Sequence, residues 1–91
     1  MRIVWTPAAA ADLEQISDFL FEQNAATAVR LVRQIYSAAS TLKRFPNKGR
    51  PRKKEGTREL VLQRLPWVII YDASGQIVRI TRVLHGAQRW P

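Results

Sequence analysis

Apolar residues in the first half of the chain recur at the spacing of a helix. Leu13, Ile16 and Leu20 are separated by three and four residues, which sets them on one side of a helix. The Thr6–Pro7 pair supplies an N-cap residue and a proline for the first helical position. We therefore predict a helix that begins after Pro7 and stops at Gln23–Asn24.

A second helix is predicted from about Ala26 to Phe45, where Pro46 ends it. Its apolar positions again follow a spacing of three and four: Ala28, Val32, Ile35, Ala39 and Leu42. Because the joint between the two helices is short, they should pack as an antiparallel hairpin that takes up nearly half of the chain.

The other apolar segments are short, branched and aromatic, as strands are. One precedes the helices, at residues 2–5, and three follow them, at residues 58–65, 67–71 and 77–84. Residues 47–56 are expected to form a loop because of their Gly and Pro content. The order β-α-α-β-β-β predicts an α+β fold, in which the two-helix antiparallel hairpin packs on a mainly antiparallel four-stranded sheet.

The last predicted strand divides its side chains between two faces by alternation. Val78, Ile80, Arg82 and Leu84 share the face expected against the helices, and Ile77, Arg79, Thr81, Val83 and His85 share the open face. Arginine grips phosphate and imidazole exchanges protons near neutral pH, so Arg79 and His85 are candidates for phosphate binding or acid–base chemistry. A hydrogen-bonded histidine beside a solvated arginine explains the same pattern. Arg82, on the core face, either snorkels at an edge or pairs with a carboxylate.

Composition narrows the class of protein. The chain of 91 residues is 46% hydrophobic and 24% charged, which is typical of a single folded domain over residues 1–91. With no cysteine and one histidine, disulfides, thiolate nucleophiles and the common zinc sites are excluded, and neither metal nor cofactor is expected. No apolar run approaches the roughly 20 residues that span a bilayer, and a signal-peptide pattern is missing. We expect a soluble cytoplasmic protein without a membrane partner.

Positive charge is the strongest compositional feature. Fifteen Lys and Arg residues against seven Asp and Glu give a net charge of +8 and an isoelectric point near 11.2. The charge is also segregated, since residues 1–24 carry one basic and four acidic residues, whereas residues 25–91 carry 14 basic and three acidic ones. A basic surface kept for solubility is the simpler explanation. The segregation of charge along the chain nevertheless favours a protein that binds nucleic acid or another acidic partner.

More than half of the positive charge lies between residues 43 and 58. Eight cations stand there against Glu55 alone: Lys43, Arg44, Lys48, Arg50, Arg52, Lys53, Lys54 and Arg58. Such a run is usually a solvated loop, but its Gly and Pro residues should hold it in a turn beside the sheet. Phosphate contacts of this kind give affinity without reading a sequence, so we expect contact with nucleic acid or the ribosome here.

Four segments, taken with the order of the elements, carry a family resemblance. They are the basic loop Phe45–Pro51, the strands Thr57–Leu60 and Trp67–Tyr71, and the ending Arg82–Trp90. Together they resemble the RelE/ParE superfamily of bacterial toxins, often labelled plasmid stabilisation proteins. The resemblance covers the whole chain and implies the growth-arresting toxin of a type II toxin–antitoxin module. It also implies a partner, a small acidic antitoxin encoded beside the toxin, whose helix and extended segment wrap it.

The resemblance implies one of two targets. RelE-like members cut mRNA on the ribosome without a metal, whereas ParE-like members poison DNA gyrase and cut no RNA. The implied catalytic residues are His85, Arg79 and Arg58, and the implied contacts to nucleic acid or target are Lys48, Arg50, Arg52, Lys53, Lys54, Arg64, Arg82, Arg89 and Trp90.

Individual positions favour one or the other of these two groups, the RelE-like and the ParE-like members. His85 and Trp67 match residues of RNA-cutting relatives, but a Val-Leu-His segment is also frequent in ParE-like members. Val68 stands where RelE has an arginine, which weakens the nuclease interpretation. The high basicity and the expected Arg79–His85 face support it, so ribosome-dependent mRNA cleavage is the expectation and gyrase poisoning the alternative. A non-toxic basic DNA-binding module is a third and remote alternative, against which stands the composition of both helices, since neither resembles a recognition helix.

Overall fold

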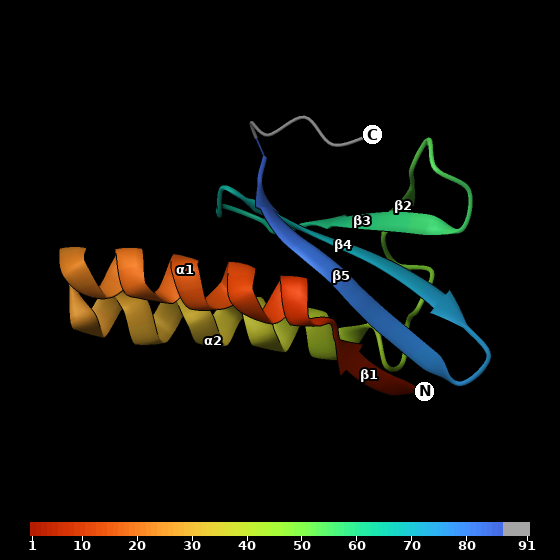
Figure 1. Cartoon of the computed structure of the whole chain (residues 1–91), viewed down its shortest axis with the longest axis horizontal. Coiled ribbons are helices and arrows are strands. Elements are labelled where there is room, and N and C mark those ends of the chain that lie inside the picture. Colours follow the sequence, from red (N-terminus) through yellow and green to blue (C-terminus); the bar gives the residue numbers. More distant parts are fainter. Residues whose placement is uncertain (87–91) are drawn as a thin grey trace.

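Two helices form one layer and a five-stranded sheet forms the other (Figure 1). The computed structural model describes residues 1–86. The elements are β1 (Arg2–Trp5), α1 (Pro7–Gln23), α2 (Ala25–Thr41), β2 (Arg50–Pro51), β3 (Thr57–Val61), β4 (Trp67–Ser74) and β5 (Ile77–His85). The predicted α+β architecture is confirmed, but residues 1–86 hold five strands instead of four, because Arg50–Pro51, expected in a loop, pairs antiparallel with β3. No helix in the described range is long and apolar enough to cross a membrane.

A single residue joins the two helices. Asn24 has an extended backbone, and its Oδ1 accepts a hydrogen bond of 3.0 Å from the Thr27 N–H, so it ends α1 and caps α2 at once. Thr6 caps α1 in the same way, accepting from the Ala9 N–H at 3.1 Å. α2 ends at Thr41, earlier than predicted, because the chain tightens there: the N–H groups of residues 42–44 donate to the carbonyl oxygens three residues back.

β5 lies in the interior of the sheet, whose order is β1-β5-β4-β3-β2. β1 pairs with it in parallel and β4 in antiparallel orientation. Trp5 of β1 stacks on Tyr36 of α2, with ring centroids 5.7 Å apart and planes 5° apart, so β1 is also tied to the helical layer. The first and last strands of the chain are therefore neighbours.

A β-bulge in β5 changes which side chains face the helices. Ile80 pairs with Tyr71 and Arg82 pairs with Ile70, which leaves Thr81 without a partner residue in the ladder. The alternation shifts by one at this point, so Val83 joins Val78 and Ile80 in the core. The prediction that Val83 and His85 share the open face with Arg79, and that Leu84 belongs with Val78, is therefore wrong.

The core lies between the helical hairpin and one face of the sheet. The predicted stripes are confirmed except at Val32, which is only half-buried and is replaced by Leu31 against the core. Ala28, Ile35 and Ala39 of α2, Leu42 at its C-cap and Leu20 of α1 are buried, and Leu13 and Ile16 pack against them. The sheet and the adjoining Leu62 of the β3–β4 connection contribute Leu60, Leu62, Trp67, Ile69, Tyr71, Val78, Ile80 and Val83. The hairpin projects beyond the sheet at the end where α1 meets α2, so part of its inner face has no strand beneath it (Figure 1).

Candidate partner-binding groove

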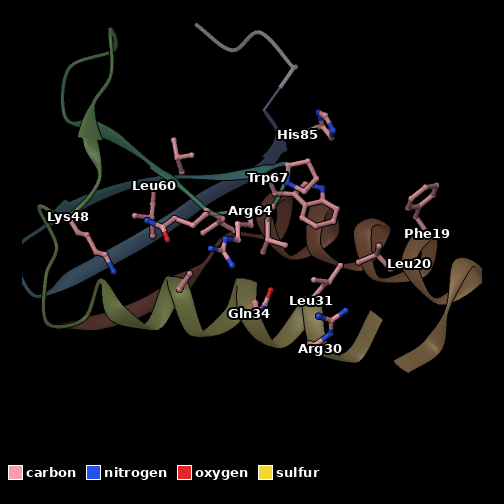
Figure 2. A pocket seen from close by; sticks show the side chains of 16 residues that line it. Phe19, Leu20, Arg30, Leu31, Gln34, Lys48, Leu60, Arg64, Trp67 and His85 are labelled. Carbon is pink, nitrogen blue, oxygen red and sulfur yellow. The ribbon is translucent and has the colours of Figure 1, made fainter. Parts of the chain in front are cut away.

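A groove of about 1190 Å³ opens between the helical hairpin and the turn that joins β3 to β4 (Figure 2). α1 and α2 form one wall, and residues 60–67 form the other. The floor is apolar, with Leu20, Leu62 and Trp67 almost fully buried beneath it. On the rim, Phe19 is 59% exposed and Val61 51% exposed. Large apolar side chains left in water beside a concave surface are typical of a protein-binding site.

The ionisable residues that line the groove are all basic. They are Arg30 on α2, Lys48, Arg64 in the β3–β4 turn and His85 at the end of β5, and no Asp or Glu lines it. Lys48 Nζ lies 3.4 Å from Thr41 Oγ1. Neither Arg30 nor Arg64 forms a hydrogen bond or ion pair with any residue in the range 1–86. An apolar floor with a basic rim is complementary to an amphipathic segment that carries carboxylates.

Arg64 has an unusual backbone conformation. The Leu65 N–H donates to the Leu62 carbonyl oxygen at 3.3 Å, which closes a tight turn with Gln63 and Arg64 at its two central positions. The φ angle of Arg64 is +63°, in the left-handed region that a residue with a Cβ adopts only at a cost. This pattern is that of a type II turn, in which glycine is strongly preferred at the position that Arg64 occupies.

The residues expected to form a catalytic site are not close together. Arg58 points to the helical face, where its Nη1 donates to the Gly49 carbonyl oxygen at 2.7 Å. Arg79 lies on the opposite face of the sheet and forms an ion pair of 3.4 Å with Asp72. His85 is on the helical face at the far end of β5, between the groove and a smaller hollow of about 300 Å³. In residues 1–86, no cluster of His, Cys, Asp or Glu side chains is arranged to hold a metal ion.

Arg82, expected to contact the target, is held by α1. Its Nε and Nη2 donate to the two oxygens of Asp12 at 2.6 and 2.9 Å, and the same carboxylate accepts from the Val83 N–H at 2.9 Å. The pairing with a carboxylate considered from the sequence is therefore the one observed. The hydrogen bond to Asp12 raises the pKa of Arg82 above its ordinary value. Asp12 thus fastens the first helix to the edge of β5 beyond the end of β1.

The basic segment after α2 is anchored by a buried tyrosine. The Tyr71 hydroxyl donates to the Pro46 carbonyl oxygen at 2.7 Å and accepts from the Gly49 N–H at 2.8 Å. Burial raises the pKa of this phenol, against the opposing effects of the Gly49 N–H and of the Arg58 charge. Gly49 is required by close approach, because a Cβ there would lie 2.7 Å from the Glu59 carbonyl oxygen and from the Tyr71 ring.

The other predicted contact residues occupy a second region, the β2–β3 hairpin. Arg50 forms an exposed ion pair of 2.6 Å with Glu59, and Arg52 is half-buried. Lys53 and Lys54 are exposed in the connection between the two strands. Lys48 and Arg64 lie in the groove instead. Arg89 and Trp90 lie outside the described residues.

Two residues of the groove were not found from the sequence. Phe19 precedes Leu20 and falls off the apolar stripe of α1, and Arg30 is a cation within α2 that no sequence pattern singles out. An aromatic residue beside a helical stripe, and not in it, is a signal of exposed apolar surface and could have identified Phe19.

Comparison with known proteins identifies the class. A family model described as "ParE toxin of type II toxin-antitoxin system, parDE" matches residues 3–90. The chain belongs to this family, within the RelE/ParE superfamily of toxins of type II toxin–antitoxin systems, as the resemblance in its sequence implied. Membership of the family implies a cognate antitoxin.

Particular relatives agree with this assignment. The Sinorhizobium fredii protein that carries the name toxin Y4kP is 38% identical over 90 residues, which are 99% of this chain and 93% of the relative. "Toxin RelE2" of Caulobacter vibrioides is 34% identical over 87 residues, or 96% and 97% of the two chains. A chain of the chromosomal ParDE system from P. aeruginosa superposes with a TM-score of 0.85 at 31% identity, over 93% and 95% of the two chains. A YoeB/ParE toxin from Agrobacterium tumefaciens, at 22% identity and a TM-score of 0.64 over 93% and 98%, shares the fold.

Proposed function

We propose that this toxin arrests bacterial growth by binding a protein target, DNA gyrase, and that it does not cut RNA itself. One observation carries the proposal, namely the separation of the side chains from which an RNA-cutting site would be built. Arg79 and His85 lie on opposite faces of β5, and the guanidinium of Arg58 is taken up by carbonyl oxygens. Cleavage without a metal needs a proton-transfer group and a phosphate-binding cation within reach of one phosphate. Arg58, Arg79 and His85 do not meet that requirement.

The groove supports a second part of the proposal, in which an acidic antitoxin binds the toxin and inhibits it. Its apolar floor and its basic rim fit an amphipathic helix of an acidic antitoxin, with apolar side chains against Leu20 and Trp67 and carboxylates toward Arg30 and Arg64. The net charge of +8 would draw such a chain in and make the association rate sensitive to salt.

A second candidate function is ribosome-dependent mRNA cleavage, which the sequence favoured. The observation in its favour is that His85 lines the same groove as Lys48 and Arg64, so one histidine and two cations share a surface. On this alternative, Arg64 and Lys48 would replace Arg79 and Arg58 as phosphate ligands.

Two assays run on the same purified toxin separate these functions. We expect the wild type to leave ribosome-bound mRNA intact in primer extension, and to inhibit supercoiling by gyrase while gyrase-linked DNA breaks accumulate. His85→Gln should alter toxicity only as far as it alters contacts, and Arg33→Ala, an exposed change on α2 outside the groove, serves as the control. Cleavage of mRNA by the wild type that falls roughly 10²–10⁴-fold in His85→Gln, with gyrase unaffected, would overturn the proposal in favour of the nuclease.

A further inference from the structure

We infer that Arg64 is a specificity-determining residue of the groove. Its guanidinium pairs with a carboxylate of the antitoxin. The unfavourable backbone conformation of the β3–β4 turn positions this guanidinium at the groove. The inference rests on the proposed function, in which an acidic antitoxin occupies the groove. It adds the toxin residue that recognises the antitoxin, Arg64, and the chemical group that this residue recognises, a carboxylate.

The argument begins with a comparison of three hairpin connections. Each of the connections β2–β3, β3–β4 and β4–β5 contains one residue with a positive φ angle. In the first and the last this residue is a glycine, Gly56 at +81° and Gly75 at +61°, and neither lines the groove. In the middle connection it is Arg64, the sole non-glycine residue of the range 1–86 with a positive φ. The chain therefore uses glycine wherever the turn alone matters, and arginine where the turn borders the groove.

Nothing within the described part of the chain accounts for an arginine at this position. Arg64 is exposed and forms no hydrogen bond or ion pair with residues 1–86. Figure 2 shows its side chain extending from the turn toward α2, across the groove. Backbone strain that contributes no internal contact is a mark of a functional position.

The surroundings of Arg64 specify the chemistry of its partner. No Asp or Glu of residues 1–86 lines the groove, so the proposed carboxylate that pairs with the guanidinium belongs to the antitoxin. A guanidinium presents its donors in a rigid planar fork that fits a carboxylate with two parallel hydrogen bonds. The buried side chains of Leu62 and Trp67 lie beneath the floor next to this turn, so a bound helix would exclude water and strengthen the pair. The occupant is thus a helix whose Asp or Glu faces the β3–β4 turn while its apolar side covers the floor.

The experiment measures binding of the full-length toxin to the purified product of the adjacent antitoxin gene at moderate salt. Arg64→Gly and Arg64→Asn both remove the guanidinium, and both residues tolerate a positive φ, so the turn survives in each. Arg33→Ala is the matched control, because it removes one exposed cation from α2 outside the groove. Each Asp and Glu of the antitoxin's toxin-binding half is then replaced by Ala, singly and together with Arg64→Asn.

We expect the two Arg64 variants to bind roughly 10–100-fold more weakly, mainly through faster dissociation, with a Tm no lower than that of the wild type. Arg33→Ala should bind within roughly threefold of the wild type, and one antitoxin carboxylate should lose its effect in the Arg64→Asn background. The inference is overturned if the Arg64 variants bind as tightly as Arg33→Ala. It is equally overturned if they bind antitoxin normally but lose cleavage of ribosome-bound mRNA, which would assign Arg64 to a phosphate. A wild-type toxin that does not bind the antitoxin at all would refute the proposed occupation of the groove by an acidic antitoxin, and not only the role of Arg64.

Discussion

Replacing Asp12 by Ala should destabilise the toxin more than any other change to a single surface carboxylate. The Asp12 side chain is 13% exposed and accepts three hydrogen bonds, two from Arg82 and one from the Val83 N–H. The bond from Val83 is charge-assisted and contributes about 1.5–3 kcal/mol. The ion pair adds about 1 kcal/mol at most, since Arg82 is still 29% exposed. We therefore expect a loss of about 2–4 kcal/mol, or a fall in Tm of about 10–25 °C.

The measurement is urea unfolding followed by circular dichroism, supported by thermal melts. Asp12→Asn should cost less, because the amide oxygen still accepts from the Val83 N–H although the charge is lost. Glu14→Ala, which removes an exposed carboxylate two residues away, should change the free energy of unfolding by less than about 0.5 kcal/mol. If Asp12→Ala is no more destabilising than Glu14→Ala, the link between α1 and the edge of β5 does not contribute as reasoned.

Further predictions concern the basic segment and its anchor. Tyr71→Phe removes a hydroxyl that bonds both Pro46 and Gly49 and should cost about 1–3 kcal/mol in urea unfolding. Because burial raises the pKa of Tyr71, wild-type stability in alkaline melts should hold up to about pH 10 and fall above it as the phenol ionises, a fall that Tyr71→Phe should lack. Gly49→Ala should cost about 1–3 kcal/mol in the same urea assay, since its Cβ would collide with a backbone carbonyl and the Tyr71 ring. Lys53→Ala with Lys54→Ala should leave the fold within about 0.5 kcal/mol of wild type and weaken gyrase binding, less so as salt rises; unchanged toxicity would remove both lysines from recognition.

The helical half of the fold was predictable because its signals are local. The apolar spacing of Leu13, Ile16 and Leu20 and the caps at Thr6 and Asn24 are readable within a few residues of each position. These residues determine the hairpin with little help from the sheet, so pattern and structure agree there.

The faces of β5 were mispredicted because the bulge depends on distant contacts. The Thr81 hydroxyl donates to the Ile70 carbonyl oxygen at 3.0 Å, and the Thr81 carbonyl oxygen accepts from the Thr6 hydroxyl at 3.0 Å. Neither contact has a local signature, since no glycine or proline marks the position. Alternation alone therefore placed His85 on the same face as Arg79, and the expected Arg79–His85 face depended on that error.

The groove was only partly visible in the sequence. Its walls come from α1, α2 and the β3–β4 turn, which are far apart along the chain and meet through the topology of the fold. The positive φ of Arg64 had no signal either, because the tight turn that demands it would have been expected at a glycine.

The position of β5 between β1 and β4 also constrains how a nascent chain can fold. β1 is synthesised long before the strand with which it pairs, Ile77–His85, because both helices and the other three strands lie between them in the chain. The hairpin of α1 and α2 consists of local contacts and can form early, whereas closing the sheet needs a loop of more than seventy residues to be brought together. The β1–β5 ladder can therefore close only after residues 77–85 have been made, and until it closes the edge of β5 is open to aggregation or capture by another chain. An antitoxin already present in the cell would meet the toxin in this window, before growth could be arrested.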